Sequence, residues 1–173
     1  DTLAHSIRVA FLETTGLGLS SPQMALPKLI EMKRSGMISE GALIMTLSDY
    51  LVYLLTGNRI GDSSTAALLG LFNLADESWW QRAFDTTRLD SSMFSSPKRP
   101  GSVAGATLAN SGLSIPGGVP VFVGGLDHYV GAIGSGTSTI ADLCESTGTV
   151  LSCLCIGEVQ PAAGACVGPG VTG

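Results

Sequence analysis

The chain has 173 residues, of which 45% are hydrophobic and 13% charged, with 23 glycines and a formal net charge of −5; this composition is that of a globular chain and excludes a disordered one. The nine basic residues are scattered, without the stripe of positive charge that nucleic acid or an anionic membrane requires. No apolar run reaches the ~18–20 residues of a membrane-spanning helix, and the first residues lack a signal-peptide pattern, so we expect a cytoplasmic protein that binds neither nucleic acid nor membrane.

The first part of the chain is predicted to be helical. A helix is expected from Pro22 to Gly36, because a Ser-Ser-Pro start precedes a helical apolar face and a terminating glycine. A second helix is expected from Ser39 to Leu55, because leucines recur three or four residues apart and Gly57 follows.

Shorter elements are predicted to follow these helices. Residues 62–65, Asp-Ser-Ser-Thr, can cap a short segment that ends at Leu71. A helix that contains both tryptophans is expected from about Glu77 to Phe84, and a polar loop then continues to Pro100.

The second part of the chain is predicted to consist mainly of strands and turns. Residues 103–108 are expected to form a strand or a link from a strand to a helix, and strand-like segments are expected at residues 119–123, 140–145 and 150–156. Residues 119–123 are apolar without alternation, which indicates a parallel strand covered on both faces. A helix is expected over residues 127–134, and residues 146–149 are expected to join the last two strands as a hairpin. This order of elements predicts an α/β fold.

The four cysteines, Cys144, Cys153, Cys155 and Cys166, all lie in the last 30 residues. Their spacing lacks the paired C-x2-C pattern of zinc sites, so no metal ligand is assigned to them. We interpret them as small, half-buried strand residues that stay reduced.

An acid follows the predicted parallel strand directly. Gly124 and Gly125 remove side-chain bulk there, and Asp127 comes next but one. Ligands of open α/β sheets bind beyond the carboxyl ends of the strands, where an Asp can take the proton of a hydroxyl that attacks phosphorus. The alternative is that Asp127 caps the following helix and that His128 is an ordinary polar residue of its first turn.

The predicted hairpin turn carries a second candidate site. Residues 146–149 read Ser-Thr-Gly-Thr, and successive backbone amides in such a turn can form an anion site to which threonine hydroxyls add donors. The alternative is a plain hairpin turn without a ligand.

Five motifs follow one another in a consistent order. Residues 124–136 read Gly-Gly-Leu-Asp-His-Tyr-Val-Gly-Ala-Ile-Gly-Ser-Gly, and residues 145–149 read Glu-Ser-Thr-Gly-Thr. Upstream, residues 27–29 read Pro-Lys-Leu, residues 48–57 read Ser-Asp-Tyr-Leu-Val-Tyr-Leu-Leu-Thr-Gly, and residues 62–64 read Asp-Ser-Ser. Together they resemble the FGGY family of carbohydrate kinases.

The resemblance covers residues 14–156, with two departures. Glu31 stands where the family often has Trp, and His128 stands where many members have Asn after the catalytic Asp. The resemblance implies the actin-like, ribonuclease H-like ATPase fold of sugar kinases. Residues 1–137 would be the later half of the first domain, with a helical insertion, and residues 138–173 the start of the second.

The resemblance also implies an activity, the ATP-dependent phosphorylation of a sugar hydroxyl in a xylulokinase-like reaction. Asp127 would be the general base and would contact the sugar together with His128. Gly148 and Thr149, with Thr147, would bind the phosphates of ATP. Phosphate oxygens and water would hold Mg²⁺, so no protein metal ligand is assigned. The partners implied are a sugar and ATP, and a homodimer is compatible with the family.

The family's amino-terminal phosphate loop and downstream adenosine-binding segment do not occur in these residues, so we expect the isolated chain to be inactive. One alternative is a non-catalytic sugar-binding or assembly module on the same half-fold. A second is a ribonuclease H-like nuclease using Asp62, Asp127 and Asp142, but a supporting set of basic residues is missing.

Overall fold

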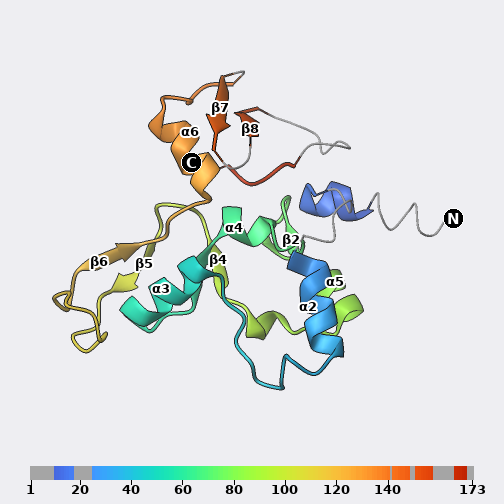
Figure 1. Cartoon of the computed structure of the whole chain (residues 1–173), viewed down its shortest axis with the longest axis vertical. Helices are drawn as coiled ribbons and strands as arrows, with labels where there is room; N and C mark the ends of the chain where they lie inside the picture. The colour runs from blue at the N-terminus through green and yellow to red at the C-terminus, as the bar shows by residue number, and fades with distance from the viewer. Residues whose placement is uncertain (1–9, 18–24, 141, 149–150, 158–165, 171–173) are drawn as a thin grey trace, which may run out of the picture.

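The computed structural model describes residues 10–17, 25–140, 142–148, 151–157 and 166–170 (Figure 1). Residues 10–15 are helical. The elements that follow are α2 (Ala25–Arg34), α3 (Leu47–Thr56), β1 (Ile60–Asp62), α4 (Ser63–Ala67), β2 (Phe72–Asn73), β3 (Ser78–Trp79), α5 (Gln81–Thr87), the 3₁₀ helix η1 (Ser91–Met93), β4 (Ser96–Lys98), β5 (Val103–Ala106), β6 (Pro120–Phe122), α6 (Asp127–Gly134), β7 (Leu143–Thr147) and β8 (Leu151–Cys155). The mixture of helices and strands confirms the predicted α/β class. None of the helices in these ranges is long and apolar enough to cross a membrane.

The strands of the described ranges pair two by two. β1 and β4 are parallel, with Ile60 opposite Ser96 and Asp62 opposite Lys98. The pairs β2–β3, β5–β6 and β7–β8 are antiparallel. β4 lies in the stretch that was predicted as a loop up to Pro100. It was not predicted as a strand because its Ser-Pro-Lys sequence lacks the β-branched and aromatic residues typical of strands. In Figure 1 the β5–β6 hairpin, the α2–α5 side and the group of α6, β7 and β8 occupy three different sides of the molecule.

The first helices agree with the predicted ones in place but not in length. α2 confirms the helix predicted from residue 22, of which residues 22–24 lie outside the described ranges. Asp62 caps α4 as predicted, since its carboxylate accepts a hydrogen bond from the backbone N–H of Thr65. However, α4 ends at Ala67 and not at Leu71.

α3 begins later than predicted, at Leu47 and not at Ser39. Thr46 Oγ1 accepts a hydrogen bond from the backbone N–H of Asp49 over 3.2 Å, and the Asp49 carboxylate accepts one from Thr46 N–H over 3.4 Å. This reciprocal capping box fixes the start of the helix. Gly57 ends it in the left-handed conformation, with φ +75°, as predicted.

The helix predicted from Glu77 to Phe84 is wrong in its first half. Glu77 has φ +47°, and Trp79 belongs to strand β3. α5 begins only at Gln81, directly after Trp80. The pairing of β3 with β2 therefore overrides the helical pattern that the two tryptophans suggested.

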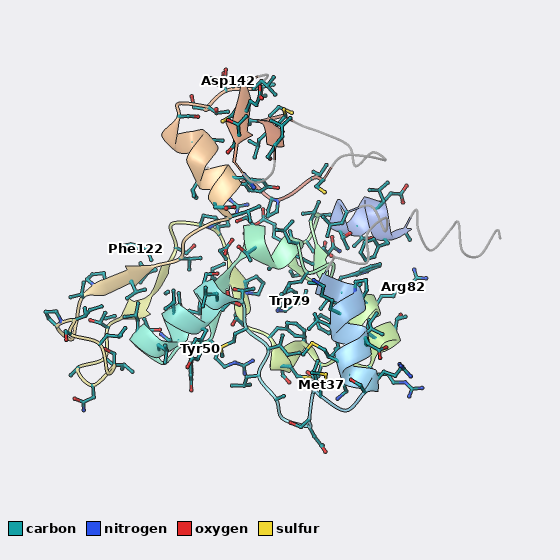
Figure 2. The ribbon with its side chains drawn as sticks, viewed as in Figure 1. Met37, Tyr50, Trp79, Arg82, Phe122 and Asp142 are labelled. Atoms are coloured by element: carbon teal, nitrogen blue, oxygen red, sulfur yellow. The ribbon has the colours of Figure 1, made fainter. Side chains whose placement is uncertain are left out.

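An aromatic cluster forms the core between α2, α5 and the segment around η1. The Trp79 ring lies 6.1 Å from that of Phe72, 6.0 Å from that of Phe84 and 5.5 Å from that of Phe94. Figure 2 shows Trp79 directed into the interior, and Phe72 and Phe84 are fully buried around it. Ala66 and Ala67 pack with Phe72, so this core anchors α4, on which part of the candidate site is built.

The parallel strand predicted at residues 119–123 is wrong in its pairing and its burial. β6 pairs antiparallel with β5, and 58% of Phe122 is exposed, which Figure 2 shows at the outer edge of the molecule. Val123 is buried. The connection contains no helix, and it closes through a hydrogen bond from Thr107 N–H to the Val119 carbonyl over 2.9 Å. Because the two ends of this loop are bonded directly opposite each other and no crossover helix lies between them, the chain reverses direction and the strands are antiparallel.

The predicted hairpin near the carboxyl end is confirmed, with a shift of two to three residues at its start. β7 pairs with β8 from Leu143 opposite Cys155 to Thr147 opposite Leu151. Ser146 and Thr147, predicted in the turn, therefore belong to β7. β7 starts late because the chain first turns at Asp142, whose carboxylate accepts hydrogen bonds from two preceding backbone amides.

The cysteine interpretation is confirmed in part. All four thiols are free, and three of them lie in the β7–β8 hairpin. Cys144 is half-buried, whereas Cys153 and Cys155 are exposed. Cys166 is exposed and lies outside the strands, so for it the prediction of a half-buried strand position is wrong.

Candidate active site

The start of α6 lies at the carboxyl ends of the parallel strands β1 and β4. After β4 the chain reaches Pro100, whose ring lies 3.4 Å from where a side-chain carbon on Gly125 would be. After β1 it enters α4, where the Ser64 hydroxyl accepts a hydrogen bond from Leu126 N–H over 2.8 Å. α6 begins at the next residue, Asp127. Asp127 is therefore placed at the edge of a parallel pair, although β6, which leads to it, is antiparallel.

A hydrogen-bond chain connects β1 to this point. Ser64 Oγ donates to Asp62 Oδ1 over 2.5 Å, and the same Oδ1 accepts from Thr65 N–H over 2.7 Å. Asp62 is 4% exposed and Ser64 is 1% exposed. Because the Ser64 proton points to Asp62, the hydroxyl oxygen is free to accept from Leu126 N–H.

Asp127 is the first residue of α6 and not its cap. Leu126 occupies the cap position and makes no side-chain cap bond, so the alternative interpretation of Asp127 as the N-cap is wrong. Asp127 is exposed, and its Oδ1 accepts a hydrogen bond from His128 N–H over 2.8 Å. A negative charge in the first turn is favoured by the helix dipole. The second carboxylate oxygen of Asp127 can therefore face a ligand while the first stays fixed.

The two glycines before Asp127 have different roles. A side-chain carbon on Gly125 would lie 2.9 Å from Val130 Cγ1, so this glycine permits close packing. A side-chain carbon on Gly124 would meet nothing within 4 Å, so this glycine faces open space. The backbone at Gly124 is thus uncovered, as a ligand beside it would require. His128, the second candidate sugar contact, is half-buried beside Asp127.

The β7–β8 hairpin lies beside α6. α6 contacts β8, and Ser135, at the end of α6, places its hydroxyl 3.4 Å from the Cys144 sulfur near the start of β7. Figure 1 shows β7 running back from that end toward the start of α6. The hairpin tip and the start of α6 therefore lie at the same end of this group. Thr147 and Gly148 are exposed at the tip, and Thr149 lies outside the described residues.

Asp142 lies away from this end. Its Oδ2 accepts hydrogen bonds from Ser138 N–H over 3.0 Å and Thr139 N–H over 2.8 Å, which lower the pKa of its carboxyl. Figure 2 shows Asp142 at the far side of the α6–β7 group. Asp62 and Asp142 thus each serve local backbone amides, and the described part of the chain contains no group of three metal-binding side chains.

A cavity of about 220 Å³ lies next to the hydrogen-bond chain, and Asp49 and Asp62 line it among mostly apolar neighbours. Burial raises the pKa of the Asp49 carboxyl, hydrogen bonding by Thr46 opposes this rise, and the negative charge of Asp62 adds to it. Nothing in the sequence indicates a buried acid at Asp49, because its spacing fits an ordinary first helical turn.

Several known proteins resemble this chain in sequence. A sequence family described as the N-terminal domain of the FGGY family of carbohydrate kinases matches residues 7–134. The autoinducer-2 kinase of Escherichia coli K12 is 30% identical over 129 residues, which are 72% of this chain and 24% of that protein. The chain therefore spans about a quarter of the length of such curated relatives.

Solved structures resemble the chain as well. The xylulose kinase from Rhodospirillum rubrum superposes with a TM-score of 0.75 at 26% identity, over 83% of this chain and 30% of that one. The Plasmodium falciparum glycerol kinase with ADP superposes with a TM-score of 0.73 at 15% identity, over 87% of this chain and 32% of that one, and it bears on the fold alone. These likenesses confirm the fold predicted from the resemblance.

Proposed function

Because this chain belongs to the FGGY family of carbohydrate kinases, we propose that the protein containing it transfers the γ-phosphoryl group of ATP to a hydroxyl group of a sugar or a closely related polyol. The observation that carries the proposal is the exposed Asp127 carboxylate, held at the carboxyl edge of β1 and β4 beside the open space at Gly124. The likeness to a xylulose kinase and to autoinducer-2 kinases favours a small, polyhydroxylated acceptor.

Asp127 is the general base of the proposed reaction. Its carboxylate takes the proton of the acceptor hydroxyl while the hydroxyl oxygen forms a bond to the γ-phosphorus. The bond between that phosphorus and the bridging oxygen of the β-phosphate breaks, and ADP leaves with the electron pair. The hydrogen bond from His128 N–H leaves one carboxylate oxygen for this step. The His128 side chain is proposed to contact the acceptor.

The tip of the β7–β8 hairpin is proposed to bind the phosphates of ATP through Thr147, Gly148 and Thr149. Two observations support a phosphate site at this tip. Thr147 and Gly148 are both exposed, and a side-chain carbon added to Gly148 would meet nothing within 4 Å. An unobstructed glycine and a threonine hydroxyl suit a phosphate group, which needs several donors close together. Mg²⁺ enters with ATP as part of the substrate, held mainly by phosphate oxygens and water.

We further propose a domain boundary near residue 137. It is supported by the family match, which ends at residue 134, and by the change from α6 to the β7–β8 hairpin beyond it. Closure between the two domains would exclude water and limit ATP hydrolysis. Since positioning of both substrates supplies most of the catalysis, the isolated 173-residue chain is proposed to be inactive, and the whole protein to act in the cytoplasm, where ATP is available.

The proposal is tested with the whole protein and a panel of pentuloses, hexuloses, polyols and linear hydroxyketones. ADP formation is followed with and without each acceptor, and the phosphorylated product is identified by mass spectrometry. Acceptor-dependent ADP formation with a stoichiometric phosphorylated product supports the proposal. Binding of an acceptor by calorimetry without any phosphorylated product would instead show a non-catalytic sugar-binding module.

A further inference from the structure

The position of Asp127 depends on Ser64, which lies 62 positions before Leu126 in the chain. Leu126, which caps α6, makes no side-chain bond of its own to the helix. Its backbone N–H is bound by Ser64, which is held by Asp62 at the end of β1. The start of α6 is therefore held from outside the helix, by α4, which follows strand β1.

The burial of this chain of groups excludes direct contact with a substrate. Ser64 is 1% exposed and Asp62 is 4% exposed, so neither side chain can reach the space in front of Asp127. A hydrogen bond from a hydroxyl to a carboxylate is among the stronger ones in proteins, and burial strengthens it further. Ser64 is thereby held in one orientation, with its oxygen aimed at Leu126 N–H.

We propose that Ser64 and Asp62 are positioning residues for phosphoryl transfer, acting through the backbone of Leu126 on the Asp127 carboxylate. This inference rests on the proposed role of Asp127 as general base. The carboxylate must lie within hydrogen-bond reach of the acceptor hydroxyl, and a displacement of about 1 Å can cost ~10²-fold in rate. Loss of the Ser64 hydroxyl releases the residue next to Asp127.

The chain supplies a matched control at the neighbouring residue. Ser63 is 3% exposed and also lies in the first turn of α4, but its buried hydroxyl has no hydrogen-bond partner within the described residues. Ser63→Ala and Ser64→Ala therefore remove the same atom at nearly the same depth. In the whole protein, Ser64→Ala is expected to lower kcat by roughly 10- to 100-fold with little change in the KM for ATP, and Ser63→Ala to leave both constants unchanged.

A double-mutant cycle separates positioning from general loss of structure. If Ser64 acts through Asp127, adding Ser64→Ala to Asp127→Asn should change the residual turnover less than twofold, although Ser64→Ala alone lowers kcat at least tenfold. If the effect of Ser64→Ala is equally large in both backgrounds, Ser64 has only a structural role and the inference is wrong. It is also wrong if Ser64→Ala alone behaves like Ser63→Ala.

Asp62→Asn replaces Ser64→Ala if the latter does not fold. An Asn can still accept from Thr65 N–H, but its bond to Ser64 loses the charge. If Asp62→Asn lowers kcat in the unsubstituted protein but not in the Asp127→Asn background, the inference is supported. If Asp62→Asn lowers kcat equally in both backgrounds, the inference is wrong. The proposed function fails separately, because it requires that Asp127→Asn alone abolishes most of the turnover.

Discussion

The Asp49 carboxylate lies against the α-carbon of Gly61, so close that a side chain on Gly61 would collide with it. Asp49 is 8% exposed and belongs to the capping box of α3, while Gly61 lies in the core strand β1. The capping box and the parallel pair thus share one contact, and a change on either side should affect both.

Gly61→Ala should therefore destabilise the protein by about 1–3 kcal/mol, the usual cost of overpacking a tight site. The added methyl group must displace the Asp49 carboxylate from Thr46 N–H. Gly131→Ala is the matched control, because Gly131 lies in α6 with nothing within 4 Å of the added carbon, and it should raise stability by roughly 0.5–1 kcal/mol. Thermal unfolding of both variants tests this, and equal Tm shifts would contradict it.

The raised pKa of Asp49 predicts a pH-dependent stability difference. The folded state keeps the Asp49 proton to higher pH than the unfolded chain, whose value is near 3.8. The folded state therefore binds more protons in that window, and this group's contribution to stability falls as the pH rises through its folded pKa. Asp49→Asn removes the cost of ionisation, so its Tm relative to that of the unsubstituted protein should increase between pH 3 and pH 7.

Glu77→Gln should behave in the opposite way. The hydrogen bond and charge of Arg99 lower the pKa of the Glu77 carboxyl, so its contribution to stability is present above the unfolded value of 4.5 and is lost as the pH falls. The Tm of this variant relative to the unsubstituted protein should thus decrease as the pH rises from 3 to 7, by a small amount because the pair is exposed. The same sign for both variants would show that the two carboxyl groups do not titrate as described.

Asp127→Asn in the whole protein should lower turnover by ~10²–10⁴-fold with a modest loss of sugar affinity, because the general base is lost and the hydrogen-bonding shape is kept. Asp142→Asn is the control, since Asp142 binds only local backbone amides, and its turnover should stay unchanged. Acceptor-dependent ADP formation and calorimetry measure the two quantities. Near-normal turnover of the Asp127→Asn variant would remove Asp127 from the mechanism.

Thr147→Val should raise the KM for ATP by roughly 10- to 150-fold, because a hydroxyl that binds a charged phosphate contributes about 1.5–3 kcal/mol. Valine keeps the shape and suits the β7 strand. Ser138→Ala, in the exposed loop before β7, is the control and should leave the KM for ATP unchanged. Initial rates at varied ATP and saturating acceptor decide between the two, and an unchanged KM in both variants would exclude Thr147 from the phosphate site.

Local patterns predicted the elements that local interactions determine. The apolar spacing located α2 and α3, the Asp62 cap identified α4, and the strand–turn–strand pattern located the β7–β8 hairpin. Tertiary pairing decided the others. Trp79 lies in a strand because β2 is available beside it, and β6 is antiparallel because its connection to β5 closes as a loop.

The candidate site could be predicted only residue by residue. Asp127 and the threonine–glycine turn were assigned through the family resemblance, because each motif alone also fitted a plain helix cap or hairpin turn. The bond from Leu126 to Ser64 joins residues far apart in the chain, and nothing in the spacing of either segment indicates it. The burial of Asp49 could not be predicted either, because it arises from contact with Gly61 of β1, which lies outside the helical pattern of α3.

Asp62 carries consequences for how this sequence can change over time. Its Oδ1 atom, at the end of β1, both caps α4 and holds the serine beneath α6. A side chain at this position without an acceptor oxygen would lose both bonds at once, so few single substitutions are open to it. Divergent copies of this segment would have to exchange residues 62 and 64 together, whereas residue 65, which contributes only its backbone N–H, could vary freely.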